Sequence, residues 1–193
     1  MTLLEEAQAE IAALEPHPHY LSQYRAAETN YWQLIPDWIA DDVAERRPAR
    51  CLDIGCAYGT LLTYIKRLSG CAVDATDFAD IYLSPVLQRR SSIRFAVSNI
   101  ELDPFPWPPG YDIILLTEVL EHFNFQPTPT LKKIRDLLLP WGRLYLSTPD
   151  AATWVGHTNT TAISPLFRSL AKACAGGSSM ITCGNSPKKS WRK

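Results

Sequence analysis

Short runs of apolar residues alternate with segments of helical periodicity through most of the chain. The apolar runs predict strands at 49–54, 71–76, 93–97, 113–116 and 143–147. The segments between them predict helices at 58–68 and 130–138 and a short helix at 79–90 that Pro85 interrupts. Strands that alternate with helices in this way indicate a mostly parallel, doubly wound sheet with right-handed crossovers and helices on both faces.

The first part of the chain has helical rather than strand periodicity. Residues 2–15 place apolar side chains on one face, and the prolines that follow are expected to end this helix. Residues 20–46 are predicted to be helical as well, with a break near Pro36. Four aromatic residues of this segment either belong to the core or line a pocket as a lid: Tyr20, Tyr24, Tyr31 and Trp32.

The turn between the first strand and its helix is the most informative stretch. It runs Asp53-Ile54-Gly55-Cys56-Ala57-Tyr58-Gly59. Glycines allow a positive φ and the close approach of a ligand, and the following helix directs unpaired N–H groups into the same space. The spacing differs from the dinucleotide motif G-x-G-x-x-G, and an acid this close would repel a diphosphate. A ligand with a positive group fits better, which disfavours an NAD-dependent oxidoreductase.

In this turn the chain resembles the class I S-adenosylmethionine-dependent methyltransferases, whose first motif is acid-x-Gly-x-Gly/Ala-x-Gly. Four further blocks follow in the family's order, and they are the strand that ends at Asp77 and residues 98–101, 111–122 and 139–149. They look like their counterparts in small-molecule methyltransferases of the group that includes ubiquinone-type O-methyltransferases. The resemblance covers roughly residues 49–150. It implies a Rossmann-like α/β fold and S-adenosyl-L-methionine as the cofactor.

The resemblance also implies a cofactor site at the carboxyl ends of the strands, where ligands of such sheets bind. Its members would be Asp53, Gly55, Ala57, Gly59, Asp77, Phe78, Asn99, Ile100 and Glu118. Asp53 would lie near the aminopropyl end of the cofactor, and Asp77 would accept both ribose hydroxyls. Asn99, where the family usually has Asp, would bind the adenine amino group, and Ile100 would pack on the ring.

Each assignment has a structural alternative. The glycines are also compatible with an ordinary turn, and Asp53 with a residue that organises the loop by accepting local N–H groups. Ile100 is equally compatible with the core, and Glu118 with an N-cap. Asp74 is a second candidate for the ribose acid, but strand alternation places it in mid-strand.

His122 is the titratable group expected nearest the methyl-transfer position. An imidazole titrates near neutrality and would deprotonate a hydroxyl acceptor, although a purely structural histidine is also compatible with this place. His17 and His19, between prolines, are expected to be exposed and to form no metal site. A sulfonium is already a good methyl donor, so catalysis requires mainly positioning and the exclusion of water.

The sequence therefore predicts methyl transfer to a small-molecule acceptor, with the methylated atom (O, N or C) unresolved. The alternative is a truncated domain that binds the cofactor but is catalytically impaired.

The net charge of −1 gives no basic field for nucleic acid, and no apolar stretch reaches the length of a membrane span. Five cysteines without C-x-x-C spacing predict reduced thiols and a cytoplasmic location. The oligomeric state is not indicated.

The C-terminal segment departs from the family, which continues with a helix and an antiparallel hairpin. Residues 157–193 lose apolar periodicity, and no acid follows Asp150. The segment is either a natural tail or the product of a frameshift. The sequence as a whole predicts an N-terminal helical cap at 1–47, a cofactor-binding core at 48–156 and an irregular or disordered tail at 157–193. The hairpin would be missing, and the fifth strand would be an uncovered edge.

Overall fold

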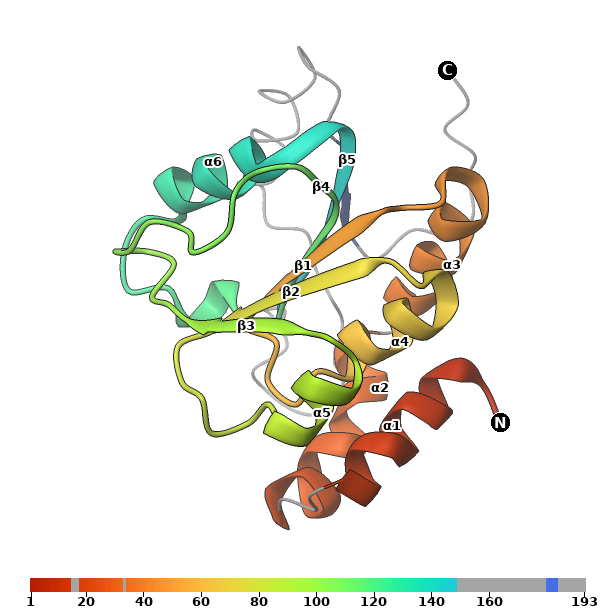
Figure 1. The fold of residues 1–193 in the computed structure, drawn as a ribbon. Helices are drawn as coiled ribbons and strands as arrows, with labels where there is room; N and C mark the ends of the chain where they lie inside the picture. The colour runs from red at the N-terminus through yellow and green to blue at the C-terminus, as the bar shows by residue number, and fades with distance from the viewer. Residues whose placement is uncertain (15–17, 33, 149–179, 184–193) are drawn as a thin grey trace.

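A parallel β-sheet forms the centre of the protein (Figure 1). The computed structural model describes residues 1–14, 18–32, 34–148 and 180–183. The sheet has six strands in the order β3-β2-β1-β4-β5-β6, and every neighbouring pair is parallel. The strands are β1 (Arg50–Ile54), β2 (Ala72–Asp77), β3 (Arg94–Val97), β4 (Tyr111–Thr117), β5 (Leu138–Ser147) and β6 (Met180–Cys183). The predicted doubly wound α/β fold is confirmed.

The helices lie where the periodicity placed them, with shifts at their ends. They are α1 (Leu3–Leu14), α2 (Arg25–Trp32), α3 (Ile35–Arg46), α4 (Thr60–Ser69), α5 (Pro85–Arg90) and α6 (Pro127–Leu137). A π-helical turn η1 (Tyr20–Tyr24) precedes α2, and a 3₁₀ turn η2 (Leu120–His122) follows β4. Helix α5 is shorter than predicted because the Ser84 hydroxyl caps the Val86 N–H and Pro85 takes the first helical position.

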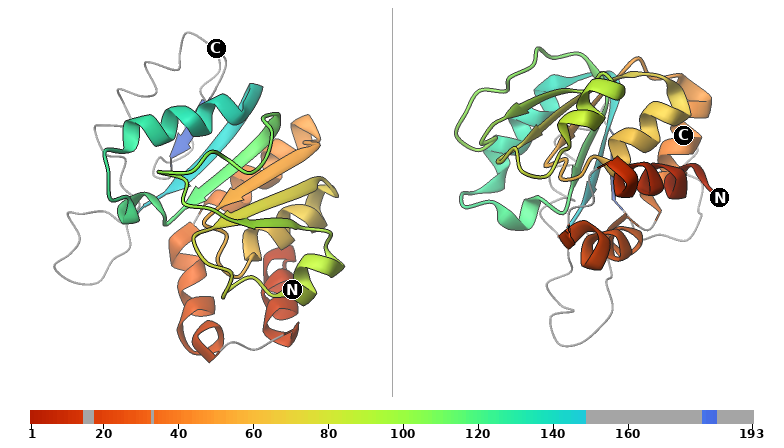
Figure 2. Two further views of the ribbon diagram at one scale, coloured as in Figure 1. Left: turned by 60° about the vertical axis from the view of Figure 1, so that its left-hand side comes forward. Right: turned by 60° about the horizontal axis from the view of Figure 1, so that its bottom comes forward.

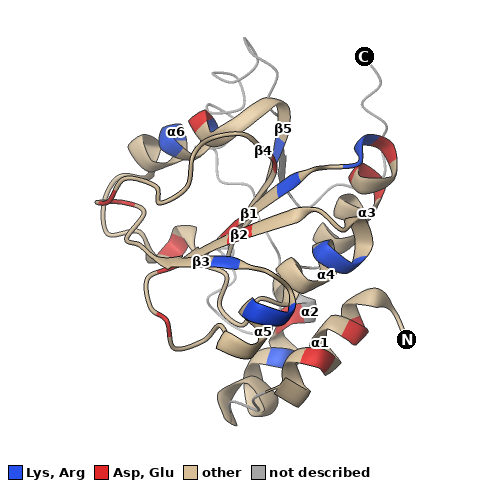
Figure 3. Ribbon diagram, in the orientation of Figure 1, with Lys and Arg blue, Asp and Glu red and all other residues tan. Residues whose placement is uncertain are grey.

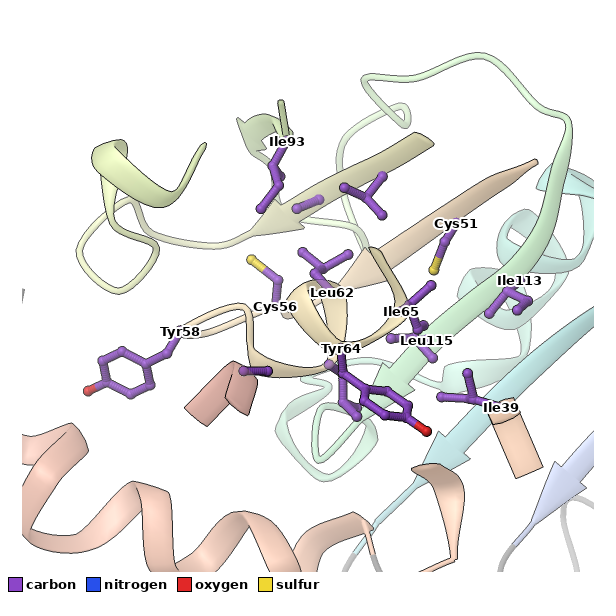
Figure 4. Close-up of a cluster of buried hydrophobic side chains, with 14 of the residues drawn as sticks. Ile39, Cys51, Cys56, Tyr58, Leu62, Tyr64, Ile65, Ile93, Ile113 and Leu115 are labelled. Carbon is purple, nitrogen blue, oxygen red and sulfur yellow. The ribbon is translucent and has the colours of Figure 1, made fainter. Parts of the chain in front are cut away.

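The two faces of the sheet bury separate hydrophobic clusters. Along β1, Cys51 faces α1–α5, while Leu52 and Ile54 face α6. Figure 2 shows the N-terminal helices and α4 on one side of the strands and α6 on the other. Figure 4 shows the larger cluster, in which Leu62 and Ile65 of α4 pack toward the sheet. This two-sided burial explains why the central strands are almost continuously apolar.

A buried carboxylate connects the N-terminal helices to α4. Glu28 of α2 is fully buried, and its Oε1 accepts from the Thr60 hydroxyl at 2.5 Å. Its Oε2 accepts from Gln8 Nε2 at 2.7 Å and from the Tyr20 hydroxyl at 3.5 Å. Burial raises the pKa of Glu28 to about 7. Because Thr60 is the first residue of α4, this network connects the N-terminal helices to the helix that follows the glycine turn.

Asp74 lies in mid-strand, as its place in the sequence predicted. Its buried carboxylate accepts from Tyr111 at 2.7 Å, from Arg50 at 3.1 Å and from Arg94 at 2.5 Å. The Arg94 guanidinium also stacks 4.7 Å from the Trp107 ring centroid. Asp74 therefore joins β1, β2, β3 and β4 on the face opposite α4.

One expectation for the C-terminal segment is wrong. Met180–Cys183 forms β6, which pairs with β5 from Arg143 to Leu146, so this part of the β5 edge is covered. The unpaired N–H and C=O groups of an edge strand attract any extended segment, and Ile181 and Thr182 favour such a conformation. The rest of 157–193, on which the expected absence of the family's hairpin depends, lies outside the described residues.

Candidate functional site

A cavity of about 570 Å³ opens at the carboxyl ends of the central strands. Ile54 of β1, Thr76 of β2 and Thr117 of β4 are among its walls. It spans the point between β1 and β4 where the strand order reverses, which is where open α/β sheets bind ligands. Most of the predicted site residues line it, namely Gly55, Ala57, Asp77, Phe78, Asn99, Ile100, Glu118 and His122. Asp53 and Gly59 are not part of the lining.

The glycine turn has a left-handed backbone at three positions. φ is +76° at Gly55, +43° at Ala57 and +79° at Gly59. A Cβ on Gly55 would lie 2.3 Å from Val119 Cγ2, and one on Gly59 would lie 2.6 Å from a Leu83 methyl. A substitution at either glycine is therefore strained by the positive φ, and it would also displace a neighbouring side-chain methyl. Gly59 caps α4 and supports the turn from behind, whereas Gly55 and Ala57 face the cavity.

Asp77, at the end of β2, holds this turn. Its Oδ2 accepts from the Ala57 N–H at 2.9 Å, and its Oδ1 accepts from the Phe78 N–H at 2.8 Å. Burial raises the pKa of its carboxyl, and the N–H donors partly oppose that rise. Phe78 itself is 74% exposed at the cavity. Asp77 thus combines an orienting role with a place in the cavity wall.

Asp53 lies beneath the cavity rather than in its wall. Its side chain is only 3% exposed, and burial together with the nearby Asp77 raises its pKa to about 8. Among the described residues, Oδ1 accepts no hydrogen bond. The alternative role of Asp53, in which its carboxylate organises the loop by accepting local N–H groups, is therefore not supported by the contacts of Oδ1.

Glu118 follows β4 and faces the cavity. Its backbone has a φ of +54°, and its N–H donates to the Ser147 carbonyl at 3.0 Å. Burial raises the pKa of its carboxyl to about 7, and Glu121 adds to the effect. The N-cap of η2 is Val119, so the N-cap alternative for Glu118 is wrong.

Asn99 and Ile100 lie together after β3. Asn99 Oδ1 accepts from the Glu101 N–H at 3.1 Å, which forms a local turn, and the residue is exposed at the cavity. Ile100 is 9% exposed and belongs both to the hydrophobic cluster beneath α6 and to the cavity wall. Its two predicted roles, core residue and ring contact, are therefore compatible.

His122 lines the cavity from η2 with a side chain that is 78% exposed. Its Nε2 lies 4.0 Å from Glu121 Oε1. Because so much of the imidazole is in solvent, its place gives it access to an acceptor at the cavity mouth but little rigidity.

Sequence reasoning missed one wall of the cavity. Tyr24, Tyr58, Tyr82 and His19 contribute to the lining. His19 is exposed as expected, but it lies in a helical segment before η1, and its Nδ1 is 3.1 Å from the Tyr58 hydroxyl. Of the four aromatics predicted as lid or core, Tyr20 and Trp32 are core and Tyr24 lines the cavity. No periodicity in the sequence distinguishes these roles.

The donors and acceptors of the cavity suit a polar, positively charged ligand. Thr76 Oγ1 and Ser98 Oγ are buried at its wall and have no hydrogen-bond partner among the described residues. Asp77, Glu101 and Glu118 supply carboxylates. The basic residues of α4 lie in its last turn, at the end of the helix away from the glycine turn (Figure 3). These features fit S-adenosylmethionine, whose sulfonium and amino groups carry positive charge.

Comparison with known proteins gives the family. Residues 23–175 match the methyltransferase domain family, so the chain belongs to it. A ubiquinone biosynthesis O-methyltransferase of Xanthomonas euvesicatoria pv. vesicatoria is 33% identical over 104 residues, 52% of this chain and 43% of that protein. One from Aeromonas salmonicida is 30% identical over 116 residues, 58% of this chain and 48% of that protein. The matches thus span about half the length of these relatives.

Solved structures share the fold at lower identity. A plantazolicin methyltransferase BpumL, in complex with a pentazolic desmethylPZN analog and SAH, aligns with a TM-score of 0.60 at 17% identity. The alignment covers 90% of this chain and 76% of that one. The N-methyltransferase NodS from Bradyrhizobium japonicum WM9 aligns with a TM-score of 0.56 at 18% identity, covering 76% and 84%. The protein is a class I S-adenosylmethionine-dependent methyltransferase domain by family and fold. None of the described helices is both long and apolar enough to span a bilayer.

Proposed function

We propose that this chain transfers the methyl group of S-adenosylmethionine to a hydroxyl oxygen of a small-molecule acceptor. The observation that carries the proposal is the acid-lined cavity at the carboxyl ends of β1, β2 and β4 in a chain of the methyltransferase domain family. Transfer to oxygen is supported by the curated relatives, which are named as O-methyltransferases.

The cofactor-binding residues proposed are those that the resemblance implied. Asp77 binds the ribose hydroxyls, Asn99 the adenine amino group and Ile100 the adenine face. Gly55, Ala57, Phe78 and Glu118 complete the contact surface, while Asp53 and Gly59 act from beneath it. When bound, the cofactor supplies a methyl group activated by its sulfonium. The protein's part is then to position the acceptor and exclude water.

The setting of this activity is also a proposal. The acceptor is a small molecule, and the cytoplasmic location rests on the free cysteines, of which Cys51, Cys56 and Cys71 are buried. The division into a cap at 1–47, a core at 48–156 and a tail at 157–193 remains a prediction.

Two measurements test the proposed function. Calorimetry should show binding of adenosylhomocysteine in preference to NAD, and a labelled methyl group should be transferred to a hydroxylated acceptor. Preferential binding of NAD would contradict the cofactor assignment. Binding of adenosylhomocysteine without turnover over a broad acceptor panel would instead support the catalytically impaired alternative.

The acids of the cavity predict a pH-dependent affinity for the cofactor. Near pH 6 the carboxyl of Glu118, with a pKa of about 7, is mostly protonated in the free protein. A bound cation favours its charged form, so binding releases a proton, and the affinity for adenosylmethionine should rise about tenfold from pH 6 to pH 8. Adenosylhomocysteine, which lacks the sulfonium charge, should show a smaller rise. Calorimetry with both ligands at three pH values measures the difference.

The control for this prediction is the exposed Glu45. Glu118→Gln should flatten the pH dependence for adenosylmethionine, whereas Glu45→Gln on the surface of α3 should leave it unchanged. Equal slopes for the two cofactor forms would show that the carboxyl of Glu118 does not sense the sulfonium.

His122 is proposed as the acceptor base or orienting group. His122→Ala should lower turnover about a hundredfold, the scale expected for loss of a general base or for a misplaced acceptor, while the affinity for adenosylhomocysteine stays constant. Its large exposure means that the substitution removes few packing contacts. If thermal stability and cofactor affinity both fall while turnover per bound site does not, His122 is structural.

A further inference from the structure

The cavity has an aromatic wall to which the proposed function gives no chemistry. Tyr58 is its centre, with ring centroids 4.9 Å from Tyr24 and 5.5 Å from Tyr82. His19 reaches the same wall and places its Nδ1 3.1 Å from the Tyr58 hydroxyl. Tyr24, Tyr58, Tyr82 and His19 all line the cavity. This wall comes from the N-terminal segment and from the turns after β1 and β2.

Tyr58 is fixed by the turn that faces the cofactor cavity. It lies between Ala57 and Gly59, both with positive φ, and its side chain is 4% exposed. Figure 4 shows its ring directed away from Leu62 and Ile65, with the hydroxyl at the outer end. The ring is held by its aromatic neighbours rather than by the sheet. Movement of the hydroxyl relative to the glycine turn is therefore restricted.

His19 links this hydroxyl to solvent. Its side chain is exposed, whereas Tyr58 is buried. The phenol oxygen donates to Nδ1 when the imidazole carries its own proton on Nε2. The pair thus forms a continuous polar path from the cavity wall to the surface, in a wall otherwise made of aromatic rings.

We propose that Tyr58 and His19 form a proton relay that deprotonates the acceptor hydroxyl, and that His122 takes the orienting half of its proposed role. The proposal rests on the proposed function. As the acceptor oxygen bonds to the methyl carbon, the carbon–sulfur bond breaks and its electron pair stays on sulfur. The acceptor proton passes to the Tyr58 oxygen, the Tyr58 proton passes to His19 Nδ1, and the imidazolium then releases a proton to solvent. Tyr58 acts on the acceptor directly, and His19 acts through Tyr58.

The surroundings of Tyr58 and His19 determine which of the two side chains holds the proton. Burial, with Tyr82 adding to it, raises the pKa of Tyr58, so the phenol remains protonated and transmits a proton instead of accumulating as a phenolate. The rings of Tyr20, Tyr24 and Tyr82 pack against the pair, and the carboxylate of Glu28 accepts from the Tyr20 hydroxyl. An imidazole is the side chain suited to hold the proton near neutral pH.

The test uses 4-nitrophenol, whose absorbance reports its own ionisation, bound to the full chain saturated with adenosylhomocysteine. In the wild type the relay should accept the phenolic proton. The pH at which bound 4-nitrophenol is half-ionised should then be at least one unit lower in the wild type than in His19→Ala or Tyr58→Phe. Tyr31→Phe is the matched control, because Tyr31 contacts Tyr24 in the same chain of rings but does not line the cavity. It should behave as the wild type.

Several outcomes overturn the relay. The relay is overturned if bound 4-nitrophenol has the same ionisation curve in the wild type and in His19→Ala. It is also overturned if the wild type does not bind 4-nitrophenol. If His19→Ala does not fold, His19→Gln and the isosteric Tyr58→Phe provide the comparison, with melting temperature and adenosylhomocysteine affinity as checks. Failure of the proposed function is distinguishable, because it appears as lost adenosylhomocysteine binding or absent methyl transfer in the wild type. A wild type that binds and methylates while both variants match it in turnover refutes only the relay.

Discussion

Asp77→Ala is expected to weaken adenosylhomocysteine binding by about 1.5–3 kcal/mol, which is the free energy of a hydrogen bond to a charged group. The carboxylate has two tasks in the proposed site. It accepts from the Ala57 and Phe78 N–H groups and so holds the glycine turn, and it faces the cavity where the ribose is proposed to bind. Both are lost in alanine. Isothermal calorimetry on folded protein measures the change.

The matched control is Asp80, an exposed acid a few residues further along the same loop that does not line the cavity. Asp80→Ala should bind adenosylhomocysteine as the wild type does. Asp77→Asn keeps one acceptor oxygen and should fall between the wild type and alanine. An unchanged affinity in a folded Asp77→Ala protein would remove Asp77 from the site.

Glu28→Gln is expected to change the pH dependence of stability. The folded pKa of about 7 lies above the ordinary value of 4.5, so the folded state holds a proton that the unfolded state has released between these two values. Stability is therefore lost as pH rises through this window, by about 3 kcal/mol in total at roughly 1.4 kcal/mol per pH unit. Glutamine does not titrate and removes this loss. Relative to the wild type, Glu28→Gln should gain about that amount between pH 4.5 and pH 7.5.

Denaturant unfolding at several pH values tests this, with the difference between the two curves as the quantity of interest. Taking the difference removes the contribution of Asp53 and Glu118, which titrate in both proteins. Glu45→Gln on the exposed side of α3 provides a control that should run parallel to the wild type. Parallel curves for Glu28→Gln as well would mean that Glu28 is charged in the folded protein at acidic pH.

Local pattern was sufficient for strands β1 to β5 and for most of the cavity. The strand that ends at Ile54 and the one that ends at Thr117 are apolar runs, and parallel strands present their carboxyl ends at one edge. Asp77, Asn99 and Glu118 follow such ends, so their convergence on one cavity was predictable without coordinates. Helix α5 begins at Pro85, the predicted interruption, because the Ser84 hydroxyl caps the Val86 N–H.

The roles of the individual acids required the tertiary structure. Asp53 and Asp77 both end up buried at the glycine turn, but only Asp77 lines the cavity. Alternation along a strand predicts the face of the sheet on which a side chain lies. It does not predict which other residues cover that side chain, and this decides whether the side chain reaches the cavity. Likewise, the β5 edge was expected to be uncovered because the tail has no apolar periodicity, yet Met180–Cys183 pairs with it as a parallel strand.

The sequence by itself determined the class of fold, the glycine turn and the edge of the sheet where a ligand binds, because these depend on periodicity and on residues close together in the chain. Only the tertiary structure decided what the N-terminal segment contributes. The contacts of Glu28 with Thr60 and of His19 with Tyr58 join residues far apart in sequence. Such contacts depend on which helix face meets the core, and burial, which sets the pKa of a carboxyl or phenol, exists only after that packing has formed.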